Sequence, residues 1–203
     1  MSSGPTAVLF DVGNVIVRWD PRTLYSKIFP DAGERDRFLA DVCTPAWHVE
    51  HDRGAAMADT IPALAARFPQ YADAICAWLD RHPEMFSAAI PETEAVIEDL
   101  FVRGVPLYAL TNMPQDYWAF TQSLSPVFGR FRDIVVSSDE GLIKPDPRIF
   151  ELACERAGLT PCDLLFIDDS RANVDAARAL GFPVHLFEDP AALRPAMEAN
   201  GLL

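Results

Sequence analysis

The chain has 203 residues, a length that accommodates one α/β domain or a core domain with a smaller insertion. Half of the residues are hydrophobic and 23% are charged, as is ordinary for a soluble globular protein. The formal net charge of -13 argues against a surface for nucleic acid, although a small anionic substrate needs only a few local cations and backbone N–H groups.

The cysteines and the N-terminal segment bear on cellular location. The four cysteines are far apart and form no C-x-x-C pair, which predicts reduced thiols rather than a zinc site or disulfides. We see no secretory signal pattern and no apolar run near the ~20 residues that span a bilayer. We therefore expect a cytoplasmic protein that binds neither nucleic acid nor membrane; its oligomeric state stays open. The cysteines are Cys43, Cys76, Cys154 and Cys162.

Five short apolar runs predict the strands of a buried parallel sheet. Their hydrophobicity is continuous rather than alternating, which is typical of strands covered on both faces. From the second run onward, helical patterns at 92–103, 147–157 and 171–180 alternate with them. This alternation predicts a doubly wound, Rossmann-like α/β fold. The runs are 7–10, 105–110, 133–136, 164–167 and 183–187.

The segment between the first two strands has a different pattern. It contains amphipathic helical patterns at 21–29, 34–42, 57–68 and 72–81, and no convincing strand. Prolines and acidic residues between these patterns predict turns. We therefore expect a core formed by 1–17 and 86–203, with a helical insertion at 18–85.

Polar side chains follow the predicted strands at the points where the strands end. In an open parallel sheet, ligands bind beyond the carboxyl ends of the strands. Each of these residues alone could be a helix cap or a loop residue, but their coincidence at four strand ends predicts a single site. They are Asp11, Thr111, Asn112, Lys144, Asp168 and Asp169.

These residue types suit phosphoryl transfer. A carboxylate such as Asp11 can attack phosphorus and form an acyl phosphate that water hydrolyses. Clustered carboxylates repel one another unless a cation joins them, and Mg2+ prefers oxygen ligands. We predict Asp11 and Asp169 as direct ligands, Asp168 as the holder of a metal-bound water, and the Gly13 carbonyl as a further ligand.

Three other side chains complete the predicted phosphate site. Thr111 and the N–H of Asn112 can bond the phosphoryl oxygens, while Lys144 neutralises the charge that develops on them. We therefore predict Asp11, Thr111 and Lys144 as the catalytic group.

Four segments resemble the motifs of the haloacid dehalogenase (HAD) superfamily of hydrolases, in the same order and spacing. They are 9–15, 108–112, 144–150 and 166–174, and the match covers nearly the whole chain. The resemblance implies that Asp11 is the nucleophile, that Mg2+ is the cofactor, and that the insertion is a helical cap that selects substrate. It also places Gly13 and Asn14 in the loop that binds substrate.

One position departs from the family pattern. Most phosphatases of the family carry a second Asp two residues after the nucleophile, as general acid and base, and here that residue is Gly13. The Asp-x-Gly-Asn-Val variant resembles a branch that includes an α-glucose-1-phosphate phosphatase. A sugar 1-phosphate, whose leaving oxygen needs less help, fits this change. Alternatively, His48 or His51 in the cap contacts the substrate and supplies the proton.

The sequence thus predicts a Mg2+-dependent phosphatase that acts on a small phosphorylated metabolite through an aspartyl phosphate on Asp11. One alternative is a 2-haloacid dehalogenase with the same nucleophile. Such enzymes resemble this chain but generally lack the acidic pair, so Asp168 and Asp169 favour the phosphatase. A second alternative, favoured only by Gly13, is a catalytically impaired member that binds a phosphorylated ligand.

Overall fold

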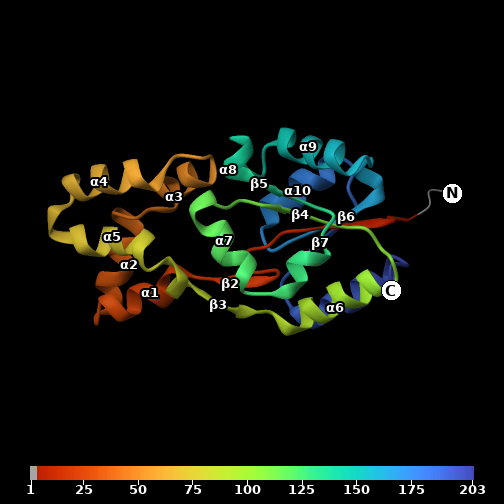
Figure 1. Ribbon diagram of the computed structural model, residues 1–203, viewed down its shortest axis with the longest axis horizontal. Coiled ribbons are helices and arrows are strands. Elements are labelled where there is room, and N and C mark those ends of the chain that lie inside the picture. The colour runs from red at the N-terminus through yellow and green to blue at the C-terminus, as the bar shows by residue number, and fades with distance from the viewer. Residues whose placement is uncertain (1–3) are drawn as a thin grey trace.

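A parallel five-stranded sheet forms the centre of the computed structural model, which describes residues 4–203 (Figure 1). Every neighbouring pair of its strands is parallel, which confirms the predicted α/β fold. The fourth strand in the chain, β4, begins two residues later than predicted, because Pro106 has no N–H to donate to a ladder. In spatial order the strands are β5 (Asp133–Val136), β4 (Leu107–Thr111), β1 (Ala7–Phe10), β6 (Leu164–Asp168) and β7 (Val184–Leu186).

Helices cover both faces of this sheet. Along β1, Ala7 and Leu9 belong to one apolar cluster, which includes buried residues of α9 (Pro147–Ala157) and α10 (Arg171–Ala179). Val8 and Phe10 belong to the other cluster, with residues of α6 (Pro91–Val102) and α11 (Pro190–Ala199). Because successive side chains of a strand point to opposite faces, the continuous apolar runs fill two cores.

The helices of the insertion gather beyond one end of the sheet, at the left of Figure 1. Four of them match the predicted positions to within two residues, and a fifth, α3, is additional. Pro45 occupies the first turn of α3, and the hydroxyl of Thr44 accepts the Trp47 N–H at 3.0 Å, which caps the helix. The helices are α1 (Pro21–Ile28), α2 (Ala32–Asp41), α3 (Pro45–Asp52), α4 (Met57–Arg67) and α5 (Ala72–Asp80).

A two-stranded antiparallel ribbon joins the insertion to the rest of the chain. It consists of β2 (Val17–Trp19) and β3 (Phe86–Ala89), so the expectation of no strand in this region was wrong. The strands have three and four residues, too few for a recognisable pattern, and they form a separate sheet of two strands. They lie where the division between core and cap is predicted.

The remaining helices connect the sheet with the cap. The hydroxyl of Tyr117, in α7 (Gln115–Ser123), donates to the Trp78 carbonyl of α5 at 2.8 Å. The short helix α8 (Ser137–Glu140) contacts α3. Four 3-10 turns complete the structure: η1 (Pro69–Tyr71), η2 (His82–Met85), η3 (Pro126–Arg130) and η4 (Pro161–Asp163). Within residues 4–203, no helix is both long and apolar enough to cross a membrane.

Candidate active site

A lysine and two carboxylates meet in the interior at the carboxyl ends of the strands. Asp11 follows β1, and Asp168 is the last residue of β6. The ammonium Nζ of Lys144 lies 2.8 Å from Asp11 Oδ1 and 2.6 Å from Asp168 Oδ2, and it donates to the Leu110 carbonyl at 2.9 Å. All three charged side chains are buried. The structure thus brings together three of the predicted residues.

The electrostatics of this group favour an additional cation. Burial raises the pKa of Asp11 to about 7, with a further increase from Asp168, while Lys144 acts in the opposite direction. Burial also disfavours the Lys144 charge, but Asp11 and Asp168 together raise its pKa above the ordinary value. One ammonium group therefore faces two buried carboxylates, and Asp169 adds a third negative side chain nearby.

The donor set fits a small hard cation. Oxygen atoms of Asp11, Asp168 and Asp169 lie within 4.8 Å of one another, which suits the oxygen ligands and octahedral geometry of Mg2+. Asp168 is held by the Ser170 N–H at 2.8 Å and by the Asn173 amide at 3.0 and 3.1 Å, whereas Asp169 is exposed. Asp168 is thus fixed in the interior while Asp169 is accessible; the roles predicted for them toward the metal stay predictions.

Thr111 and Asn112 lie at the end of β4 but differ in what they contact. The Thr111 hydroxyl is buried and has no hydrogen-bond partner in the described part of the chain, so it is available to an oxygen of a ligand. The Asn112 side chain donates to the Lys144 carbonyl at 2.9 Å and accepts the Lys144 N–H at 2.8 Å. Asn112 therefore positions the lysine; its predicted bond to the substrate stays a prediction.

The loop after Asp11 contacts the ribbon. Asn14 has a positive φ of 56°, and its side-chain Oδ1 accepts the Trp19 N–H at 3.1 Å. Burial raises the pKa of Asp169, and the Asn14 side chain acts in the opposite direction. A Cβ placed on Gly13 would meet no atom within 4 Å. The position at which related phosphatases carry the second Asp is thus sterically open.

A cavity of about 120 Å³ opens beside Gly13 between the core and the cap. Its walls combine the loop after Asp11, the residues after β4, the ribbon and the helix α3. The lining residues are Gly13, Trp19, His48, Asp52, Phe86, Asn112, Met113, Pro114 and Tyr117.

The two cap histidines lie at different distances from this cavity. His48 lines it, stacked on Trp19 with ring centroids 5.1 Å apart. Burial, together with nearby His51, lowers the pKa of His48 to about 3, so the ring is neutral at pH 7. His51 does not line the cavity; its Nε2 lies 2.6 Å from the Thr60 hydroxyl of α4, and burial lowers its pKa. The predicted proton donation by either histidine stays a prediction.

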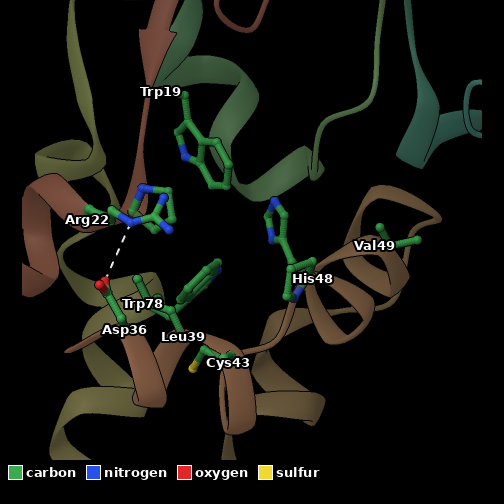
Figure 2. A pocket seen from close by; sticks show the side chains of 11 residues that line it. Trp19, Arg22, Asp36, Leu39, Cys43, His48, Val49 and Trp78 are labelled. Carbon is green, nitrogen blue, oxygen red and sulfur yellow. Dashed lines mark ion pairs between the residues drawn. The ribbon is translucent and has the colours of Figure 1, made fainter. Parts of the chain in front are cut away.

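A larger cavity of about 560 Å³ lies within the cap (Figure 2). Trp19 and His48 line both cavities, so the two adjoin at this stacked pair. Figure 2 shows Arg22 and Asp36 paired at one side, with their charged groups 3.6 Å apart. Most of the remaining wall is apolar: Pro21, Leu39, Ala40, Cys43, Pro45, Val49 and Trp78.

Three residues of the site were not singled out from the sequence. Asn173 holds Asp168, and its place in the first turn of the helix after the acidic pair was the available signal. Trp19 belongs to a strand too short to recognise. Asp52 lies next to His51, but because the helix α3 was not predicted from the sequence, nothing indicated which of these side chains faces the core.

The comparison with protein families agrees with this site. The model of the haloacid dehalogenase-like hydrolases matches residues 5–181. The chain belongs to this family of hydrolases, as the four motifs implied.

Three curated relatives show how the similarity is distributed. Sesquiterpene phosphatase astK of Aspergillus oryzae is 24% identical over 186 residues, which are 86% of each chain. Acyl-CoA dehydrogenase family member 10 of Mus musculus is 33% identical over 99 residues, 48% of this chain and 9% of that protein. Phosphoglycolate phosphatase of Escherichia coli is 31% identical over 93 residues, 46% of this chain and 37% of that protein. The alignment thus spans less than half of the last two relatives.

Solved structures share the fold. The HAD-family enzyme bt-2542 of Bacteroides thetaiotaomicron has a TM-score of 0.72 at 21% identity, over 94% of this chain and 98% of that one. A further structure of that enzyme contains magnesium and inorganic phosphate. A dehalogenase solved with an intermediate has a TM-score of 0.71 at 16% identity, over 97% of this chain and 98% of that one. Identities this low support the fold and leave the substrate open.

Proposed function

We propose that this hydrolase is a Mg2+-dependent phosphatase that cleaves a small phosphorylated metabolite through an aspartyl phosphate on Asp11. The observation that carries the proposal is the pairing of buried Lys144 with two carboxylates, close to a third. Without a cation this arrangement would leave excess negative charge in a low-dielectric site, and with one it would bind a phosphoryl group.

The contacts of Asp11 suit a nucleophile. Lys144 and the Val12 N–H, the latter at 2.7 Å, both bond Oδ1, which leaves Oδ2 for attack on phosphorus. Attack breaks the bond from phosphorus to the leaving oxygen and forms an acyl phosphate, which water then hydrolyses to inorganic phosphate. The Thr111 hydroxyl and Lys144 would hold the phosphoryl oxygens during both displacements.

The magnesium site is part of the proposal. The side chains of Asp11, Asp168 and Asp169 would hold the ion, with the Gly13 carbonyl as the further ligand. A bound Mg2+ supplies neutralisation of the charge on the transferred phosphoryl group. A related fold that holds magnesium and inorganic phosphate, and a relative along most of the chain that is a phosphatase, support this assignment.

The substrate and the location of the protein also remain proposals. A sugar 1-phosphate fits the absence of an acid at Gly13, and a cytoplasmic location fits the sequence. The alternative of a 2-haloacid dehalogenase is favoured by the dehalogenase neighbour, but the acidic pair at 168–169 opposes it because carbon attack needs no metal. The phospho-ligand-binding alternative is opposed by the complete charged group.

Hydrolysis of p-nitrophenyl phosphate tests the proposal. We expect turnover that requires Mg2+, stops with EDTA and falls to background in Asp11→Asn. Asp175→Asn, an exposed carboxylate on α10, is the matched control and should retain activity. Metal-independent release of chloride from 2-chloropropionate would instead establish the dehalogenase. Absence of hydrolysis with any divalent metal, together with saturable binding of phosphate, would establish the binding role.

A further inference from the structure

We propose that Asp52 is the general acid of this enzyme and takes the part of the acid missing at Gly13. The inference rests on the proposed phosphatase function. Asp52 ends α3, is buried, and lines the small cavity together with Gly13. Its Oδ1 has no hydrogen-bond partner among residues 4–203, which is uncommon for a buried carboxylate and leaves that oxygen available to a substrate.

Two contacts fix Asp52 over the strand ends. The Ser137 hydroxyl donates to the Asp52 carbonyl at 2.6 Å and accepts the Met113 N–H at 2.9 Å, so one side chain joins the end of α3 to the segment after β4. Two residues later, Gly54 has a φ of +97°, and a Cβ there would lie 2.7 Å from the Ser138 carbonyl oxygen. Only glycine permits this close approach. The cap therefore delivers Asp52 to a defined place on the core.

The charges around Asp52 suit a group that exchanges a proton near neutral pH. Burial raises the pKa of Asp52 to about 7, while Lys144 and Arg53 act in the opposite direction. The other titratable neighbours are Tyr117 and His48, whose Nε2 lies 3.7 Å from Asp52 Oδ1. Because burial lowers the pKa of His48 to about 3, this ring carries no proton to donate as a cation at pH 7.

The proton transfers balance over one turnover. As Asp11 attacks phosphorus, the bond to the leaving oxygen breaks, and the Asp52 proton moves to that oxygen to give the alcohol. The Asp52 carboxylate then takes a proton from the water that attacks the acyl phosphate. The bond between phosphorus and Asp11 breaks, inorganic phosphate is released, and Asp52 is again protonated.

Leaving-group dependence provides the test. In single-turnover measurements with Mg2+, Asp52→Asn should release a poor alkyl leaving group about 10²–10⁴-fold more slowly than the wild type. It should release p-nitrophenolate at close to the wild-type rate, because that anion leaves without a proton. Asp52→Glu should keep the wild-type dependence. Glu50→Gln, exposed on the same helix, is the matched control and should change neither rate.

A rescue makes the test independent of folding defects. Since Gly13 has open space, Gly13→Asp in the Asp52→Asn background should restore alkyl release. Equal losses for both leaving groups, no loss for either, or failure of the rescue in a folded double variant would overturn the role of Asp52. If the wild type itself fails to hydrolyse p-nitrophenyl phosphate, the proposed function fails first, and the inference falls with it.

A separate observation, the large cap cavity, carries a second inference, about the leaving group. The geometry points to the phosphate ester of an apolar alcohol, with the carbon skeleton seated in the cavity of Figure 2. The volume of about 560 Å³ lies in the range of small-molecule sites. Its only pair of opposite charges, Arg22 with Asp36, is already formed.

Three residues that line the large cavity carry a buried nitrogen atom without a hydrogen-bond partner within residues 4–203. Trp19 Nε1, Trp78 Nε1 and His48 Nδ1 are buried and have no partner in the described chain. Indole N–H groups only donate, so the cavity offers hydrogen bonds to one or two acceptors on an otherwise apolar ligand. A sugar, with a hydroxyl on almost every carbon, would leave most of its polar groups unpaired there. The cavity therefore favours an apolar alcohol over the sugar 1-phosphate that the sequence around Gly13 predicts.

A series of n-alkyl phosphates tests the second inference. We expect kcat/KM of the wild type to rise with chain length by up to about fourfold per methylene, the equivalent of about 0.8 kcal/mol, until the cavity is full. In Val49→Arg, which places a charge in the wall, this dependence should flatten. Ala46→Arg, exposed on the same helix outside the cavity, is the control and should keep it. A flat wild-type series, or higher kcat/KM for glucose 1-phosphate than for octyl phosphate, would overturn the inference.

Discussion

Replacing Asp52 with asparagine removes a carboxyl group whose pKa burial raises from 3.8 to about 7. The folded protein therefore holds this proton more tightly than the unfolded chain does. As the pH rises from 3.8 to about 7, the unfolded chain loses the proton first, and the free energy of unfolding of the wild type decreases. Asparagine has nearly the same shape and cannot ionise. The variant should therefore be more stable than the wild type at alkaline pH, although it loses its activity on alkyl phosphates.

The size of the effect follows from the titration. One pKa unit corresponds to about 1.4 kcal/mol, so the advantage of Asp52→Asn should be larger at pH 8 than at pH 5 by up to roughly 2.7 kcal/mol. For a chain of this length, this difference corresponds to a shift of about 5–10 °C in Tm. His48 gives the opposite pH dependence in both proteins, so only the difference between variant and wild type is diagnostic.

Urea unfolding at pH 5 and pH 8, in EDTA, measures this difference. Glu50→Gln controls for the removal of a carboxylate from the same helix, and its free energy of unfolding should follow that of the wild type at both pH values. If Asp52→Asn changes stability by the same amount at pH 5 and at pH 8, Asp52 ionises as it does in the unfolded chain, and the reasoning from burial is refuted.

Three further perturbations address other parts of the structure. Lys144→Met should lower the free energy of unfolding by about 3–5 kcal/mol at pH 8 in EDTA, because two buried carboxylates lose the cation that pairs with them. Urea titrations measure this difference, and a loss under about 1 kcal/mol would contradict the expectation. The lowered pKa of His48 should cost the wild type at most about 1.4 kcal/mol of folding free energy for each pH unit between 6.5 and 3, and His48→Phe should reduce this loss. Parallel curves of unfolding free energy against pH for the two proteins would contradict this. Gly54→Ala should lower the Tm more than Gly104→Ala does. Both residues have a positive φ, but only a Cβ at Gly54 would meet the Ser138 carbonyl. Equal decreases in Tm would exclude this close contact as the cause.

The sheet and its site were predictable because buried strands leave a strong signal. The runs at 7–10 and 133–136 match β1 and β5 over their whole length. Continuous hydrophobicity specifies such strands locally, and polar residues at their ends are then gathered by topology alone. This is why Asp11 and Asp168 could be assigned to one place without coordinates. Lys144 lies eight residues beyond β5, and the Asn112 side chain bonds its backbone.

The cap was less predictable because its specificity depends on packing. The helix α3 has only eight residues and ends in His51 and Asp52, two polar residues that the sequence alone would place at the surface but that are buried. Asp52, at the end of this helix, is buried, and its carbonyl accepts the hydroxyl of Ser137, which lies 85 residues further along the chain. The ribbon strands likewise depend on a pairing between segments almost seventy residues apart. No local pattern encodes such contacts.

Asn14 has a consequence for the timing of catalysis. Its side-chain Oδ1 accepts the Trp19 N–H of the ribbon at 3.1 Å, and Trp19 lines both cavities. Asn14 stands three residues after Asp11, and its neighbour Gly13 forms a β-bridge with Val17 of the ribbon. The loop that carries the proposed nucleophile is therefore joined to an aromatic wall of the cap, so that a ligand that moves Trp19 also acts on this loop.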